Sequence, residues 1–113
     1  MLLPNSHQAL IDRRKLEGYL LSTGHPVGRF KARFFGALGF SAERWSELEA
    51  AFGSKHLTQD ATPSERLVDG QLYTIRAMLQ GPTGASAVVI NVWFVRRGET
   101  APRFVTAYPG GAK

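Results

Sequence analysis

Residues 71–95, QLYTIRAMLQ-GPTG-ASAVVINVWFV, decide the fold class of this 113-residue chain. The segment 71–80 alternates in polarity with the period of two that is typical of a β-strand. The GPTG sequence at 81–84 predicts a tight turn, and 85–95 are rich in β-branched and aromatic residues. The pattern predicts two antiparallel strands. The second is apolar on both faces, as expected for a central strand that is covered on both sides.

Three helices are expected before this hairpin, and capping residues set their limits. The first and third should begin at the N-cap residues Asp12 and Ser41, and the middle one after a Gly-His-Pro turn. Glycines should end the second and third helices. The expected ranges are 12–21, 28–38 and 41–52, with Gly39 and Gly53 as the terminating glycines.

Two further segments complete the expected element order. Residues 54–70 are polar and contain Pro63 and Gly70, which predicts a long irregular loop, and a loop of this length hints at a functional or partner-ordered segment. The sequence RFVTAY at 103–108 predicts a last strand that Pro109 ends.

The order of elements indicates an α+β fold, because helices that precede strands tend to cover one sheet. We expect about three N-terminal helices packed on a three- to four-stranded antiparallel sheet. The length fits one domain, residues 1–113, with a core at about 8–109 and a flexible tail at 110–113.

Composition excludes several classes of protein. The chain has no cysteine, which rules out disulfides and thiolate metal sites. No apolar run reaches the ~18 residues of a membrane span. The start, MLLPNSHQALID, lacks the basic patch and the longer apolar core of a signal peptide. We therefore expect a cytoplasmic protein with no membrane partner, or one that a larger machine delivers.

The net charge of +5 is unevenly distributed. Residues 1–40 hold six Lys/Arg and two Asp/Glu, residues 41–70 hold three and six, and residues 71–113 hold five and one. Two basic segments thus flank an acidic one. This pattern favours either binding of a polyanion such as nucleic acid or simply a well-solvated surface.

A lysine occupies an unexpected position in the middle helix, GRFKARFFGAL. At about 100° per residue, Phe30 lies at about 100° from Arg29, Lys31 at about 200° and Phe35 at about 240°. Arg33 returns to the polar side beside Arg29. Lys31 is therefore either a snorkelling lysine whose stem covers apolar surface, or a cation held over the sheet and facing a site.

His25 precedes the same helix. A helix N-terminus with free N–H groups near Gly28 is a natural seat for phosphate, and Arg29 and Lys31 would gather there. A lone histidine in a turn is equally often structural or merely solvated. The three histidines have no Asp or Glu at ligand spacing, so no metal is expected, and no glycine-rich phosphate loop indicates a nucleotide cofactor.

The last strand supplies a second set of candidates. Alternation places Phe104, Thr106 and Tyr108 on one face and Arg103 on the other. The two hydroxyls either lie beside a phosphate or belong to an ordinary half-polar strand. Arg97, after the central strand, is either another phosphate contact or a solvated loop arginine.

Four motifs carry a resemblance to a known family: LPN near the start, GHPVGRFKARFFGALGF, VWFVRRGE and PRFVTAYP. Together they resemble a family of small bacterial proteins that share a domain of unknown function, over about residues 3–109. Members look like single-domain proteins, or like the C-terminal tips of large secreted toxins and phage-related proteins. Their genes often lie beside a gene for an antitoxin or immunity protein.

The order of helices and then sheet is also similar to ribonuclease toxins of the barnase, colicin and RelE type. That similarity implies metal-free RNA cleavage, in which the ribose 2′-OH attacks the adjacent phosphate. No glutamate occupies an obvious position for the general base. The implied catalytic residues are His25 as acid or base, Lys31, Thr106 and Tyr108, and the implied phosphate-binding residues are Arg29, Arg33, Arg97 and Arg103.

The sequence leaves three functions open. The first is a ribonuclease toxin of a toxin–antitoxin or toxin–immunity system, with RNA, free or on the ribosome, as substrate and a neutralising protein as partner. The alternative is a non-catalytic protein-binding module of such a system, an antitoxin or adaptor, whose acidic stretch 43–69 would meet a basic partner. A nucleic-acid binder without chemistry comes third, because no known binding motif is present.

Overall fold

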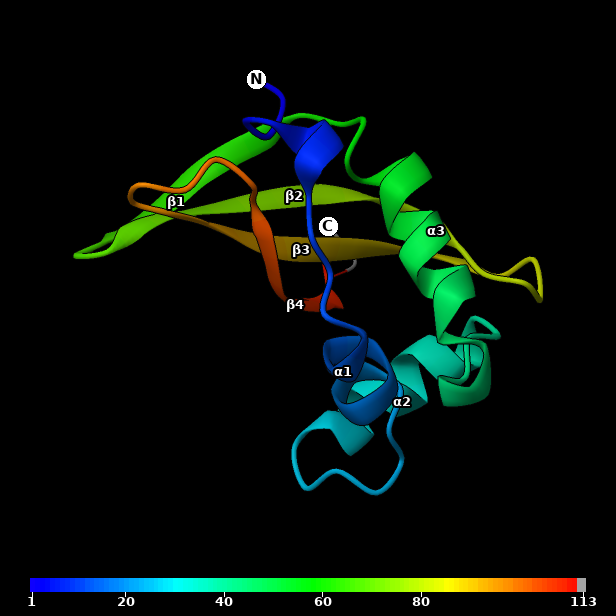
Figure 1. Ribbon diagram of the computed structural model, residues 1–113. Helices are drawn as coiled ribbons and strands as arrows, with labels where there is room; N and C mark the ends of the chain where they lie inside the picture. Colours follow the sequence, from blue (N-terminus) through cyan, green and yellow to red (C-terminus); the bar gives the residue numbers. More distant parts are fainter. Residues whose placement is uncertain (112–113) are drawn as a thin grey trace.

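The computed structural model describes residues 1–111 and places all helices before all strands (Figure 1). The α+β prediction is confirmed, with three N-terminal helices followed by a four-stranded antiparallel sheet. The helical elements are the 3-10 turn η1 (Ser6–Gln8), α1 (Arg13–Lys15) with its π-helical continuation η2 (Leu16–Leu20), α2 (Gly28–Ala37), the 3-10 turn η3 (Ala42–Arg44) and α3 (Trp45–Lys55). The strands are β1 (Ala61–Leu67), β2 (Gly70–Gln80), β3 (Ser86–Arg96) and β4 (Arg103–Pro109).

The predicted hairpin forms the centre of the sheet. Strands β2 and β3 pair without interruption from Gly70 opposite Arg96 to Gln80 opposite Ser86. The strand order is β1-β2-β3-β4, so β3 is an interior strand as its apolar sequence indicates.

The prediction of an irregular loop over 54–70 is wrong for most of that range, because residues 54–55 end α3, residues 61–67 form the edge strand β1 and residue 70 begins β2. Every side chain of β1 after Ala61 is exposed, so the strand shows no alternation between apolar and polar residues. An edge strand also tolerates Pro63, since one side of its backbone has no partner strand. A register shift between Pro63 and Arg66 further disguises the strand.

The first helix begins where its capping residue predicts. The Asp12 carboxylate accepts a hydrogen bond from the backbone N–H of Arg14 at 2.9 Å, which makes Asp12 the N-cap. The helix widens into a π-helical turn after Lys15, and Leu16 and Leu20 are fully buried. The unbroken segment α1–η2 therefore turns its leucines into the core.

Helix α2 ends in a Schellman motif, as Gly39 predicts. Gly39 has a φ of 101°, which favours glycine. Its N–H donates to the Gly36 carbonyl at 2.9 Å, and the Phe40 N–H donates to the Phe35 carbonyl at 3.1 Å. The equivalent prediction for the third helix is wrong, because Gly53 lies inside α3, which continues to Lys55.

The buried face of α2 is rotated from the expected one. Ala32, Phe35 and Leu38 are buried, whereas Phe30 is 60% exposed. The apolar arc is thus centred near Phe35 rather than between Phe30 and Leu38. Lys31 lies at the border of this arc and is half-buried.

One face of the sheet carries the core. Phe35 of α2 and Leu48 and Phe52 of α3 are in the same buried cluster as Ile75 and Trp93 of the sheet. The opposite face of β3 is half-exposed, so the expectation that the central strand is covered on both sides is wrong within residues 1–111. That opposite face consists of Val88, Ile90, Val92 and Phe94.

The structure describes the C-terminal end of the chain as far as Gly111. The N–H of Gly110 still donates to the Val88 carbonyl at 2.8 Å. Residues 112 and 113, which belong to the expected flexible tail, lie outside the described residues. Within the described part of the chain, no helix is long and apolar enough to cross a membrane.

Candidate functional site

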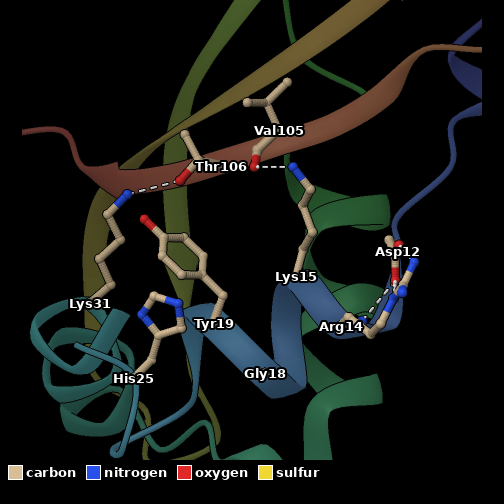
Figure 2. A pocket seen from close by; sticks show the side chains of 9 residues that line it. All are labelled: Asp12, Arg14, Lys15, Gly18, Tyr19, His25, Lys31, Val105 and Thr106. Carbon is tan, nitrogen blue, oxygen red and sulfur yellow. Dashed lines mark hydrogen bonds and ion pairs between the residues drawn. The ribbon is translucent and has the colours of Figure 1, made fainter. Parts of the chain in front are cut away.

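A pocket of about 680 Å³ lies between α1–η2, the start of α2 and β4, and we call it the helix–strand pocket (Figure 2). It brings the last strand together with two helical segments that lie far earlier in the sequence. Its cationic side chains outnumber its carboxylates, since three Lys/Arg and one histidine face a single Asp. The lining residues are Asp12, Arg14, Lys15, Gly18, Tyr19, His25, Lys31, Val105 and Thr106.

Lys31 reaches across the pocket to the last strand. Its Nζ atom lies 2.8 Å from Oγ1 of Thr106, and it stands 5.2 Å from the ring centroid of Tyr19 and 6.0 Å from that of Tyr108. The two rings attract the ammonium group, and the hydroxyl accepts one of its hydrogen bonds. Of the two interpretations of Lys31, the geometry agrees with a cation held against the sheet.

Lys15 forms a hydrogen bond with the neighbouring residue of the same strand. Its Nζ atom donates to the Val105 carbonyl at 3.1 Å. That carbonyl is available because β4 has a bulge: Thr106 is opposite Val92 and Phe104 is opposite Trp93, which leaves Val105 without a partner in β3.

Because of the bulge, the faces predicted for β4 are partly wrong. Strict alternation places Phe104 on the same face as Thr106 and Tyr108. The extra residue instead turns Phe104 into the core together with Ala107. Thr106 and Tyr108 remain together on the other face, where Lys31 contacts both.

His25 caps helix α2 instead of leaving its N-terminus free. Its Nδ1 atom accepts hydrogen bonds from the N–H groups of Val27 at 3.0 Å and Gly28 at 2.9 Å. The predicted phosphate seat near Gly28 is therefore filled by His25 itself. Since Nδ1 acts as an acceptor, the ring hydrogen belongs on Nε2, which leaves Nε2–H as a donor. The ring also packs edge-to-face on Tyr19, with centroids 5.0 Å apart.

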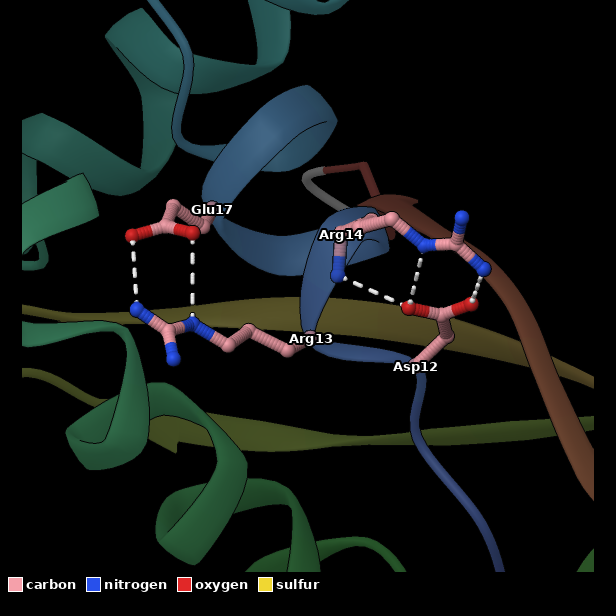
Figure 3. Close-up of polar contacts among 4 residues, drawn as sticks. All are labelled: Asp12, Arg13, Arg14 and Glu17. Atoms are coloured by element: carbon pink, nitrogen blue, oxygen red, sulfur yellow. Dashed lines mark hydrogen bonds and ion pairs between the residues drawn. The ribbon is translucent and has the colours of Figure 1, made fainter.

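The single carboxylate of the pocket is already paired (Figure 3). Asp12 accepts two bonds from the Arg14 guanidinium, at 3.1 and 2.8 Å, and one from the Arg14 backbone. These bonds from Arg14 lower the pKa of Asp12 to about 2. Asp12 is consequently ionised near neutral pH and poorly suited to accept a proton. On the other side of the helix start, Arg13 is paired with Glu17 at 3.2 Å.

The structure brings together some of the predicted site residues and separates others. His25, Lys31 and Thr106 line the pocket, and Tyr108 borders it through its contact with Lys31. Four predicted phosphate-binding arginines are not among its lining residues within residues 1–111. Arg29 lies over the Phe30 ring at 4.7 Å, Arg33 is exposed on α2, Arg103 pairs with Glu99 at 3.2 Å, and Arg97 lies beyond β3.

Sequence reasoning missed Arg14, Lys15 and Tyr19. The pattern of the first helix assigns Tyr19 to its apolar stripe. The spacing of four between Lys15 and Tyr19 is the signal that was available, because it places both residues on one side of a helix. For the described residues, no three His, Cys, Asp or Glu side chains are grouped so that they would hold a metal ion.

Comparisons with known proteins give one match. A family model described as "Domain of unknown function (DUF6883)" matches residues 2–111. No curated protein matches the chain, and no solved structure matches it. The comparisons thus show no link to ribonuclease toxin folds, and that similarity stays an expectation.

Proposed function

Because the chain belongs to the DUF6883 family, whose description states no activity, we propose its function from the helix–strand pocket. We propose that the protein is a metal-independent endoribonuclease that binds a phosphodiester of RNA in this pocket. We further propose that it acts as the toxin of a bacterial toxin–antitoxin or toxin–immunity system, on cytoplasmic RNA, and that a protein partner neutralises it.

The proposal rests on two lysines, Lys15 of α1 and Lys31 of α2, that both bind strand β4. Lys31 and Lys15 bind consecutive residues, Thr106 and Val105, so their ammonium groups flank the same bulge. Each ammonium has three N–H donors and uses one of them on the strand. The remaining donors can bind a group with several acceptor oxygens, which a phosphodiester provides.

The other pocket residues fit the same ligand. The Nε2–H of His25 is a further donor to phosphate oxygen. Figure 2 shows the Tyr19 ring between His25 and the Lys31–Thr106 pair, with its hydroxyl directed towards β4. Asp12 opposes an anion, but Arg14 neutralises that carboxylate. The pocket as a whole therefore favours an anionic ligand.

The chemistry proposed is transfer of the phosphorus from the 5′-oxygen to the neighbouring 2′-oxygen. The 2′-oxygen attacks and its proton passes to a solvent water, while the bond to the 5′-oxygen breaks and that oxygen takes a proton back from the solvent. The products are a 2′,3′-cyclic phosphate and a 5′-hydroxyl. Lys31 and Lys15 stabilise the negative charge that grows on the phosphate oxygens during attack.

His25 contributes positioning and a hydrogen bond in this scheme rather than proton transfer. To accept a proton on Nε2, the ring would need its hydrogen on Nδ1, which faces the N–H groups of Val27 and Gly28. Both capping bonds would then break. A site of this kind relies on preorganised cations.

Inducible expression in a bacterium tests the proposal. Lys31→Met keeps the aliphatic stem against Tyr19 and Tyr108 but removes the ammonium group, and we expect it to reduce kcat by about 100-fold or more. Lys55→Met removes an equal charge from an exposed position on α3 and serves as the control. Growth arrest with RNA fragments ending in a 2′,3′-cyclic phosphate is expected for wild type and the control variant only.

Purified protein must be incubated with RNA both with and without translating ribosomes, because some toxins of this kind cut only translated mRNA. A substrate with a 2′-deoxy nucleotide at the cleavage position should stay intact, since it lacks the attacking oxygen. Intact RNA in both incubations, together with normal growth on induction, would show that the protein is not a ribonuclease toxin.

A specific observation favours the alternative of a protein-binding module. The outer face of β3 presents a half-exposed apolar row, and Met78 beside it is 56% exposed. A partner protein would bury this surface. In that case Lys31→Met leaves function unchanged, whereas Val92→Asp prevents a co-expressed partner from binding.

A further inference from the structure

A second cationic groove lies at the far end of the sheet from helix α2. It has a volume of about 310 Å³ and contains Arg66 of β1, Arg96 at the end of β3 and Arg97 after it. We call it the arginine groove. Within residues 1–111, none of these three guanidinium groups makes an ion pair or a hydrogen bond. Three free arginines that face one groove repel one another, so an anion between them relieves an unfavourable arrangement.

The groove is held in shape by its backbone. The N–H of Arg97 donates to the Asp69 carbonyl at 2.7 Å, which ties the loop after β3 to the β1–β2 turn. The N–H of Glu99 donates to the Arg96 carbonyl at 2.9 Å. Glu99 is the carboxylate that lines the groove, and Arg103 already binds it at 3.2 Å. The arginine groove therefore keeps an excess of positive charge.

A groove of about 400 Å³, the connecting groove, runs along β4 between the two sites, although it shares no lining residue with the arginine groove. It shares Asp12, Lys15 and Val105 with the helix–strand pocket. At its other end it is lined by Phe94 and by Arg103, the partner of Glu99. Cations thus follow one another from Lys31 and Lys15 past Arg103 to the arginine groove.

The register of the sheet gives the length of this path. Thr106 is opposite Val92, and Arg96 lies four residues further along β3. At ~3.3 Å per residue the path is roughly 13 Å long. Folds of similar size that bind single strands cover about 4–16 nucleotides with a cationic groove and an occasional aromatic side chain. The half-buried Phe94 is an aromatic side chain on the path.

We propose that the arginine groove binds a second phosphate of the same single RNA strand whose cleaved phosphodiester lies in the helix–strand pocket. This inference rests on the proposed function, because it takes RNA as the ligand. It assigns Arg66, Arg96 and Arg97 to strand binding and gives them no part in the chemical step.

Oligonucleotides of two lengths test the assignment. The probes are fluorescent 2′-O-methyl RNAs of 3 and 12 nucleotides, which lack the attacking hydroxyl and are not cleaved, and binding is followed by anisotropy over a range of salt concentrations. The variant R66Q/R96Q/R97Q removes the three positive charges of the arginine groove. The variant R29Q/R33Q/K55Q removes the same charge from exposed positions outside the path and is the matched control.

We expect the arginine-groove variant to bind the 12-mer at least 10-fold more weakly than the control variant does, and to bind the 3-mer equally well. The slope of its salt dependence for the 12-mer should fall by about 0.7 for each phosphate that the variant no longer neutralises. Equal affinity of both triple variants for the 12-mer would overturn the inference.

Lys31→Met separates this inference from the proposed function. If that variant binds both probes as wild type does while the arginine-groove variant fails to bind the 12-mer, the groove binds RNA and the pocket does not. If Lys31→Met weakens both probes and the arginine-groove variant weakens neither, the pocket proposal stands and the second phosphate site is refuted.

Discussion

The Nζ atom of Lys31 lies 2.8 Å from Oγ1 of Thr106, although 75 residues separate them in sequence. This bond connects the start of helix α2 to the last strand. It also fixes the ammonium group between the rings of Tyr19 and Tyr108. A lysine that serves only to cover apolar surface needs no such partner, because its head group reaches water. Removal of this bond therefore tests whether Lys31 has a functional role or only a structural one.

Replacement of Thr106 by valine is the first prediction. Valine keeps the shape of threonine but removes the oxygen that accepts the Lys31 hydrogen bond. Hydrogen bonds to charged groups contribute about 1.5–3 kcal/mol when buried, and this one is only partly buried. We expect kcat/KM for RNA cleavage to fall about 10-fold, equivalent to about 1.4 kcal/mol, while the free energy of unfolding changes by less than about 1 kcal/mol.

Thr62→Val on the exposed strand β1 is the control for that experiment, since it removes a hydroxyl far from the pocket. Both variants are compared by initial cleavage rates and by urea unfolding. Unchanged cleavage by Thr106→Val would mean that Thr106 does not position Lys31 for catalysis.

The second prediction concerns the two uses of His25. His25→Ala removes the acceptor for the N–H groups of Val27 and Gly28, and loss of a cap costs about 0.5–2 kcal/mol of stability. In His25→Asn, the side-chain oxygen takes the place of Nδ1 and should restore most of that stability. Asparagine has no counterpart to a ring Nε2–H aimed into the pocket.

Thermal unfolding and cleavage kinetics of the two His25 variants separate these roles. We expect asparagine to recover the melting temperature but not the cleavage rate, if Nε2–H binds phosphate. Recovery of both properties would assign His25 to capping alone. A bell-shaped pH–rate profile that only the histidine protein shows would instead support proton transfer by His25, against the tautomer inferred from its bonds.

Local signals in the sequence predicted the fold, and long-range geometry determined the site. The Asp12 cap, the Gly39 terminus and the β2–β3 hairpin each depend on a few neighbouring residues, so composition and spacing were sufficient to predict them. Strand β1 was missed because an exposed edge strand has no buried face to impose a pattern.

The pocket could be predicted only in part, for a similar physical reason. Lys31 stood out because a charge beside buried aromatic residues is unusual in any helix. Nothing in the sequence RFVTAY predicts the bulge at Val105. The bulge nevertheless leaves the Val105 carbonyl free to accept the Lys15 hydrogen bond, and it places Phe104 and Thr106 on opposite faces of β4. How α1–η2 and α2 approach β4 depends on core packing, which periodicity does not specify.

The third prediction tests the close approach of α2 to the preceding helix. A Cβ atom added at Gly28 would lie 2.2 Å from the Tyr19 carbonyl oxygen, a backbone atom that has little room to move. Gly28→Ala should therefore lower stability by about 2 kcal/mol or more and displace Tyr19 from the pocket.

Gly36→Ala in the same helix is the matched control, because a Cβ there meets nothing within 4 Å. Alanine has the higher helix propensity, so this variant should gain up to about 1 kcal/mol. Urea unfolding measures both changes, and opposite signs are expected. Equal stability of the two variants would show that α2 does not lie against the Tyr19 backbone.

The last prediction concerns acid stability and His56 at the end of α3. His56 is fully buried, and its Nε2–H donates to the Val89 carbonyl at 3.0 Å. Burial lowers the pKa of His56 from its ordinary value of 6.5. In the unfolded chain the ring takes up a proton near pH 6.5, whereas in the folded protein it stays neutral to lower pH. The unfolded state thus binds more protons, and stability falls as the pH drops below about 6.5.

Above pH 7 we expect the contribution of His56 to the free energy of unfolding to be independent of pH. Between about pH 6.5 and the lowered pKa of His56, the free energy of unfolding should decrease by up to about 1.4 kcal/mol per pH unit. His56→Gln keeps a donor for Val89 but does not titrate, so the difference in stability between wild type and this variant should shrink or reverse on acidification. Asp12 titrates near pH 2 and does not contribute in this range. Urea unfolding of both proteins at pH 7.5, 6.0 and 5.0 measures the difference. A difference that does not change with pH would contradict a neutral, buried His56.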